Sequence, residues 1–261
     1  MNILDKIVID KRKEVELKKT IVPVSQLEAT VLFERTTNSL VHNLRNSNSG
    51  IIAEHKRRSP SKAVINQNNS VFEVATGYEN AGACGMSVLT DGKYFGGSMD
   101  DLLLARASVQ LPLLRKEFVI DEYQILEAKA YGADVILLIA AILTREEIKT
   151  LSQFAKSLGL EVLLEVHNEE ELQKSIMPSL DLLGVNNRDL KTFTVSLETS
   201  KTLSTLIPND FVKVSESGIS SVEAIKELQP YGFEGFLIGE NFMKTDNPGE
   251  SATQFIKQIT S

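Results

Sequence analysis

The sequence predicts an α/β fold of the (β/α)8 barrel type, a TIM barrel with an N-terminal helical extension. Three observations predict it. Eight short apolar runs of strand character recur along the chain, most without polar alternation, as parallel strands buried on both faces should be. Helix-start signals follow several of these runs. The length of 261 residues also suits a barrel of this type, which typically needs roughly 250.

The predicted strands are regularly spaced, with room for a helix after each. They are Gly50–Glu54, Gly85–Leu89, Leu111–Arg115, Val135–Ile139, Glu161–Glu165, Leu182–Val185, Phe211–Ser215 and Gly235–Ile238. Because strands and helices alternate, the strands should pair in parallel through right-handed crossovers, and eight such units close a barrel.

Capping boxes mark several helix starts. In such a box, the first side chain and the side chain three residues later satisfy free backbone N–H groups. The candidate boxes are Asp121–Gln124, Thr144–Glu147, Asn168–Glu171 and Ser220–Glu223. Gly132 and Gly159 are expected to end helices just ahead of the next strands.

Residues 1–48 precede the first predicted strand and are expected to form the extension, with helices at about residues 2–18 and 32–46. This extension is expected to cover the barrel bottom or to shape its rim. No low-complexity linker divides the chain, so residues 1–261 are expected to be one domain, with the barrel at 49–261.

Composition restricts the partners and the compartment. A net charge of −7 argues against nucleic-acid binding, and no apolar run approaches the roughly 20 residues of a membrane helix. The single cysteine, Cys84, fits a reducing compartment and is expected to be a small buried hydrophobe. A cytoplasmic monomer without cofactor is expected, and no cluster of His, Cys or carboxylates at ligand spacing predicts a metal.

Polar residues end several strands, where they would line one mouth of the barrel. Ile52, Glu54 and Lys56 share a face, so Glu54 and Lys56 are expected at the mouth if Ile52 points inward. The basic, hydroxyl-rich loop Arg57–Lys62 suits closure over a phosphate ester. Lys116 shares a face with Leu114 and Phe118, and partial burial there is expected to lower its pKa towards that of a useful acid.

The later strands end in the same way. Glu165 is a candidate base, and Asn186 can orient a substrate hydroxyl. Arg188 is a candidate for the site or for an ion pair with Asp189. Ser217–Gly218 and Gly239–Glu240 follow the last two strands, where glycine allows close backbone approach to a phosphate.

The three histidines are given no catalytic role. His55 has the opposite parity to Glu54 and Lys56 and is expected to face the helices. His167 is expected to be a loop residue, and His42 lies in the extension.

The segment Ile51–Lys62 (IIAEHKRRSPSK) resembles the signature of indole-3-glycerol-phosphate synthase, a (β/α)8 enzyme of tryptophan biosynthesis. Further similar segments follow in the family's order: Val88–Gly97, Leu113–Asp121, Leu163–Asn168, Gly184–Leu190, Ser215–Ile219 and Phe236–Met243. The resemblance implies a carboxy-lyase that acts on 1-(2-carboxyphenylamino)-1-deoxyribulose 5-phosphate. The ring attacks the ribulose carbonyl, the carboxylate leaves as CO2, and a hydroxyl is eliminated to give indole-3-glycerol phosphate.

By the same resemblance, Lys116 is the general acid of ring closure and Glu165 stabilises the intermediate and transfers protons. Lys56, beside Glu54, contacts the substrate carboxylate or serves as a second acid. The remaining residues implied to bind substrate or phosphate are Asn186, Glu216, Ser217, Arg188, Ser59, Gly218, Gly239, Glu240 (by its N–H) and Phe118.

Two alternative functions predict different features of the chain. Another phosphate-binding barrel, such as a phosphoribosylanthranilate isomerase, needs an acid/base pair such as Cys and Asp, and Cys84 precedes the second strand rather than ending one. A catalytically silent barrel that only binds a partner predicts loss of the charged strand ends, which are intact here.

Overall fold

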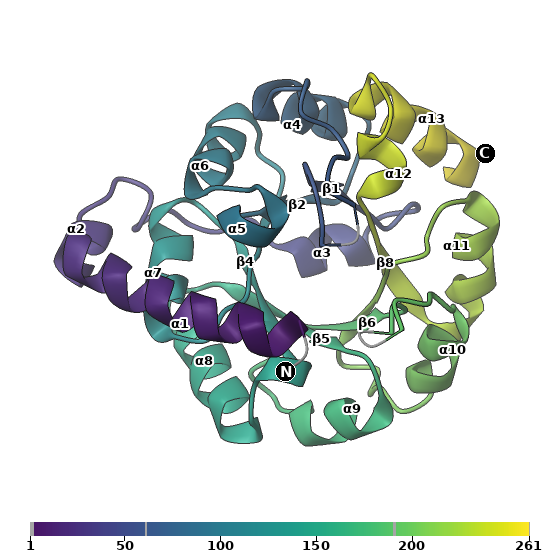
Figure 1. The fold of residues 1–261 in the computed structure, drawn as a ribbon. Helices are drawn as coiled ribbons and strands as arrows, with labels where there is room; N and C mark the ends of the chain where they lie inside the picture. Colours follow the sequence, from purple (N-terminus) through teal and green to yellow (C-terminus); the bar gives the residue numbers. More distant parts are fainter. Residues whose placement is uncertain (1–2, 61, 190–191, 261) are drawn as a thin grey trace.

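The computed structural model describes residues 3–60, 62–189 and 192–260. Within these ranges, eight parallel strands close a barrel in sequence order, each hydrogen-bonded to the next and β8 to β1. Figure 1 looks along this barrel, with the helices forming a ring around the strands. The predicted TIM barrel is therefore confirmed.

The strands lie close to the predicted ranges. They are β1 (Ile51–His55), β2 (Gly85–Leu89), β3 (Leu113–Lys116), β4 (Val135–Ile139), β5 (Glu161–Val166), β6 (Leu182–Asn186), β7 (Val212–Glu216) and β8 (Phe233–Ile238). The helices are α1 (Ile3–Ile21), α2 (Val24–Glu28), α3 (Leu40–Arg45), α4 (Val71–Asn80), α5 (Gly92–Phe95), α6 (Met99–Ser108), α7 (Glu122–Ala130), η1 (Ala140–Ile142), α8 (Arg145–Ser157), α9 (Glu169–Ser175), α10 (Glu198–Ser204), α11 (Val222–Leu228), η2 (Gln229–Tyr231), α12 (Glu240–Met243) and α13 (Pro248–Thr260).

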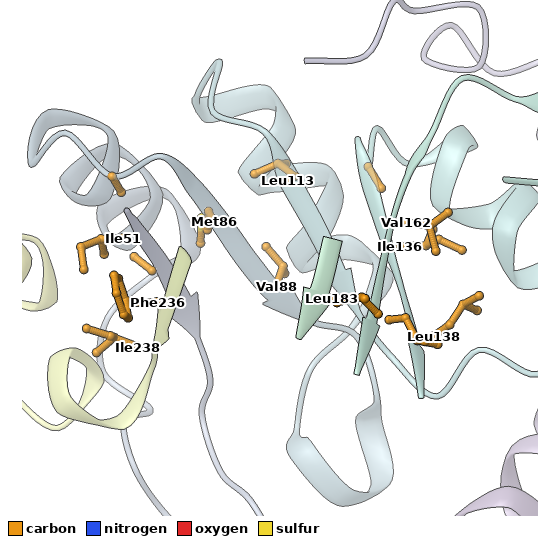
Figure 2. Packing of buried hydrophobic residues seen from close by; sticks show 14 of the residues in the cluster. Ile51, Met86, Val88, Leu113, Ile136, Leu138, Val162, Leu183, Phe236 and Ile238 are labelled. Atoms are coloured by element: carbon orange, nitrogen blue, oxygen red, sulfur yellow. The ribbon is translucent and has the colours of Figure 1, made fainter. Parts of the chain in front are cut away.

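Alternate side chains of each strand enter two different apolar layers. Outward-pointing residues such as Ile51, Met86 and Ile136 pack against the helices, as Figure 2 shows. Inward-pointing residues fill the barrel itself: Ile52, Leu114, Val135, Leu137, Leu163, Leu182, Val212, Val214 and Leu237. This alternation fixes which residues reach the mouth, because the last inward position of each strand ends there.

The helix starts agree with most of the predicted capping boxes. Thr144 and Glu147 form a complete box, and Asp121 and Asn168 cap α7 and α9. The fourth prediction was wrong by one residue, since the N-cap of α11 is Ser221. The box of Ser70 with Glu73 at the start of α4 was not predicted. Gly132 and Gly159 take the positive φ angles expected beyond helix ends.

The extension contributes to both ends of the barrel. The second predicted helix, at about 32–46, is shorter than expected: α3 covers only Leu40–Arg45, with the short α2 before it. Leu40 and Leu44 of α3 join the apolar layer inside the barrel, next to buried Cys84. At the other end, α1 runs over α7 and reaches the edge of the barrel mouth in Figure 1, and its Ile7 joins the same layer. None of the helices in the described ranges is long and apolar enough to cross a membrane.

A buried ion cluster attaches α1 to the barrel. Lys11 is 2% exposed, and its Nζ lies 2.9 Å from Asp91 Oδ2 and 3.1 Å from Glu117 Oε1. Asp91 also caps α5 by accepting from the N–H groups of Tyr94 and Phe95. Burial favours a neutral lysine, but Glu117 and Asp91 outweigh it and raise the pKa of Lys11.

Replacing Lys11 by Met should lower the free energy of unfolding by about 3 kcal/mol, because it removes the cation beside buried Asp91 and leaves Glu117 with Arg115 alone, 3.7 Å away. The measurement is urea unfolding at neutral pH. Lys6→Met, at an exposed position of the same helix, is the control and should change stability by less than about 0.5 kcal/mol. Equal effects of the two substitutions would show that the cluster does not anchor α1.

Candidate active site

A cavity of about 440 Å³ opens at the C-terminal mouth of the barrel. It is lined by every residue that the sequence predicted for the site: Glu54, Lys56, Ser59, Lys116, Phe118, Glu165, Asn186, Arg188, Glu216, Ser217, Gly218, Gly239 and Glu240. Ile3, Leu4 and Ile7 of α1 add an apolar edge, so the extension does shape the rim.

Four charged residues form one layer at the centre of this cavity. Glu54, Lys116, Glu165 and Glu216 come from β1, β3, β5 and β7, the alternate strands whose inward side chains share a level in such a barrel. Lys116 Nζ lies 2.9 Å from Glu165 Oε2 and 2.5 Å from Glu216 Oε2. One ammonium group is therefore shared between two carboxylates.

The expected lowering of the Lys116 pKa was wrong for the free protein. Burial alone would lower it, but Glu165, Glu216 and Glu54 outweigh burial and raise the pKa above its ordinary value. Lys116 is therefore protonated in the free protein, and its ammonium group places a positive charge at the floor of the cavity.

The two carboxylates beside Lys116 have opposite environments. Burial raises the pKa of Glu165, yet Lys116 and His167 lower it well below the ordinary range. For Glu216, burial and the neighbouring Glu165 prevail over Lys116 and raise the pKa to about 7. Two acids with pKa values displaced in opposite directions can serve as a base and as a proton carrier in one site.

Close packing positions these carboxylates. A Cβ atom on Gly184 would collide with Glu216 Oε1, and one on Gly239 would collide with Glu54 Oε1. Glycine at both positions therefore leaves room for a carboxylate. The contact with Glu54 thus requires glycine at position 239, in addition to the close phosphate approach that the sequence predicted.

Lys56 and Glu54 form a second ion pair at the mouth. Lys56 Nζ lies 2.5 Å from Glu54 Oε1, which confirms that the two side chains share a face with inward-pointing Ile52. Glu54 is 2% exposed, whereas Lys56 is only partly buried, and both line the cavity.

Apolar side chains form one wall of the cavity. The rings of Phe95 and Phe118 lie 5.9 Å apart at 43°, and Leu137, Ile139 and Leu237 are further apolar residues of the lining. Such a slot suits an aromatic ring. Phe95 was not predicted for the site, because its position in α5 depends on the Asp91 cap rather than on a strand end.

The opposite side of the cavity is more polar. Ser217 and Gly218 follow β7 with φ angles of 65° and 80°, and Gly239 precedes α12. Lys62 Nζ lies 2.7 Å from Glu240 Oε1, so an exposed ion pair links the loop after β1 to the start of α12. Arg188 Nη1 donates to Phe193 O at 3.3 Å, and Asn186 Oδ1 accepts from Arg188 N.

His55 and His167 differ in surroundings. His55 is buried outside the cavity lining, as its parity predicted. His167 lies in the loop after β5, as predicted, but it also lines the cavity and contacts Glu165. The sequence did not predict this contact. Glu165 and His167 point to the same side only if the backbone stays extended beyond the end of the strand.

The sequence model of the indole-3-glycerol phosphate synthase family matches residues 4–257. The chain is also similar to an indole-3-glycerol phosphate synthase of Bacteroides thetaiotaomicron, with 48% identity over 99% of both chains. One from Dechloromonas aromatica is 42% identical over 95% of this chain and 96% of the relative. The chain belongs to the indole-3-glycerol phosphate synthase family. The expected family and enzyme class, a carboxy-lyase, are thereby confirmed.

Solved structures that are more distant in sequence share only the fold with this family member. A 3-hexulose-6-phosphate synthase from Salmonella typhimurium superposes with a TM-score of 0.64 at 13% identity, over 80% of this chain and 97% of that one. A structure described as KGPDC from Streptococcus mutans gives 0.62 at 14% identity, over 81% and 97%.

The opposed environments of the carboxylates predict that Glu216 titrates at about pH 7 in the free protein. Below that pH its carboxyl is neutral, and above it the carboxylate is charged, whereas Glu165 stays ionised throughout. Carbon NMR of side-chain carboxyl groups measures this directly, and Glu216→Gln should remove the signal. A spectrum in which no carboxyl group titrates between about pH 6 and 8 would contradict the assignment.

Proposed function

We propose that the chain converts 1-(2-carboxyphenylamino)-1-deoxyribulose 5-phosphate into indole-3-glycerol phosphate, CO2 and water. The single observation that carries the proposal is the charged Lys116, held by Glu165 and Glu216 at the floor of a cavity with an aromatic wall. Ring closure needs such a proton donor facing a flat apolar slot.

Lys116 is the general acid of ring closure. The ring carbon that bears the carboxylate attacks the ribulose carbonyl carbon, and the carbonyl electron pair moves to oxygen. Lys116 supplies the proton to that oxygen and stabilises its developing negative charge. Phe118 and Phe95 line the slot in which the ring lies.

Decarboxylation and dehydration follow. The bond to the carboxylate breaks, its electron pair restores the aromatic ring, and CO2 leaves. The new hydroxyl departs as water with a proton from Lys56, which Glu54 holds in place. Glu165 removes a proton from the adjacent CH2 group, and the indole double bond forms. One solvent proton balances the loss of the carboxylate as neutral CO2.

The polar side of the cavity binds the rest of the substrate. Asn186, Glu216 and Ser217 contact the sugar hydroxyls, with Arg188 beside them. The phosphate lies against Gly218, Gly239 and the N–H of Glu240, with Ser59 from the first loop. The positive φ angle of Gly218 and the missing side chains at both glycines support this assignment.

We further propose that the chain acts as a single-domain cytoplasmic monomer without nucleic-acid partners. The net charge of −7 and the single cysteine support this. The rival isomerase activity finds no support in the cavity, since Cys84 is buried beside α3 and is absent from the lining.

The experiment that tests the proposal mixes the purified chain with the carboxyphenylamino-deoxyribulose phosphate and follows indole fluorescence. Turnover is the expected result. Absence of indole formation at micromolar enzyme would refute the proposed function.

Lys116→Ala should abolish turnover while substrate affinity stays within about tenfold, because the lysine acts mainly in the transition state. Lys149→Ala, at an exposed position of α8, is the control and should keep kcat within about twofold. Single-turnover kinetics and calorimetric binding separate the two effects. A parallel loss of affinity and rate would instead assign Lys116 to substrate binding.

A further inference from the structure

His167 lies between two carboxylates at the edge of the cavity. Its side chain is 7% exposed, its Nδ1 lies 3.0 Å from Glu171 Oε2, and its Nε2 lies 3.3 Å from Glu165 Oε1. Glu171 is held in place in turn, since it accepts from the backbone N–H of His167 at 2.8 Å and from Asn168 Nδ2 at 3.0 Å. The imidazole therefore links the end of β5 to the start of α9.

The arrangement favours a charged ring. A carboxylate can only accept, so a contact at each ring nitrogen favours a proton on both. Burial opposes that charge, but Glu165 and Glu171 outweigh it and raise the pKa of His167 to about 10. The Nε2 group makes no aligned hydrogen bond, so its effect on Glu165 is mainly electrostatic.

The described elements around His167 and Glu165 contribute the following groups. From α8, which packs against β5 and α9, Arg145 donates to Lys174 O at 2.6 Å. The turn η1, which packs against β5 and α9, contributes only apolar Ala140–Ile142. From β6, the neutral Asn186 donates to Glu165 Oε1 at 3.1 Å. Lys174 of α9 donates to Leu143 O, and Lys116 faces Glu165 at its other oxygen.

We infer that His167 is a positioning residue: its imidazolium keeps Glu165 ionised when Lys116 gives up its proton. This inference rests on the proposed function. Once Lys116 has protonated the substrate oxygen, it is a neutral amine, and Glu165 loses its main counter-charge. Burial would then drive Glu165 to take up a proton before it acts as a base. His167 supplies a second positive charge that the reaction does not consume.

The charge is tested in the free protein by NMR titration of the imidazole rings. The chain has three histidines, and His167→Gln identifies the signal of His167. His167 should remain protonated up to at least about pH 8.5, and Glu171→Gln should lower its pKa by about one unit or more. A wild-type His167 that titrates near the ordinary value of about 6.5 would overturn the inference.

The effect on Glu165 is tested by pH–rate profiles of His167→Gln and His167→Asn. Gln keeps a donor near the Nε2 position and Asn one near Nδ1, but both remove the charge. The positive ring lowers the pKa of Glu165, so its loss should move the acid limb of kcat upward by about one pH unit. Near pH 8, kcat and KM should stay within about threefold.

His42→Gln, at an exposed histidine of α3, is the matched control and should leave the acid limb in place. If the acid limb stays in place in both His167 variants, the inference is overturned, because that result is expected of a residue with a structural role alone. Failure of the wild-type protein to form indole would refute the proposed function instead, while the NMR titration still decides the charge of His167.

Discussion

The sharing of one ammonium group among buried carboxylates is the interaction on which the rest of the site depends. Lys116 lies among Glu165, Glu216 and Glu54, all in one layer of the barrel interior. A buried charge is tolerated only when it is paired, so no member of this layer is stable alone. The same pairing sets the protonation states, with Lys116 charged and Glu165 ionised.

The surrounding structure maintains this layer. Gly184 and Gly239 leave space for Glu216 and Glu54, while α3 fills the opposite end of the barrel with Leu40 and Leu44. Above the layer, α1 adds an apolar edge and is fixed by the buried Lys11 cluster. The extension thus completes both the core and the rim of the cavity, while the barrel strands supply the charged floor and part of the apolar lining.

Much of this could be predicted from the sequence, because strand parity is a local property. The shared face of Ile52, Glu54 and Lys56 follows from a period of two, and capping boxes locate helix starts within a residue. The pKa of Lys116 could not be predicted, since its direction depends on carboxylates from strands far along the chain. The contact of His167 with Glu165 and the packing of Gly239 against Glu54 are likewise products of tertiary structure.

The most direct test of the shared-cation account compares the free energies of unfolding of Lys116→Met and the triple variant Lys116→Met/Glu165→Gln/Glu216→Gln. The single substitution leaves buried Glu216 without its cation and Glu165 with His167 as its remaining cation, so a loss of about 3 kcal/mol is expected. Neutralising both carboxyl groups should recover most of that loss. A triple variant that is less stable than the single one, with each substitution adding its own cost, would contradict the account.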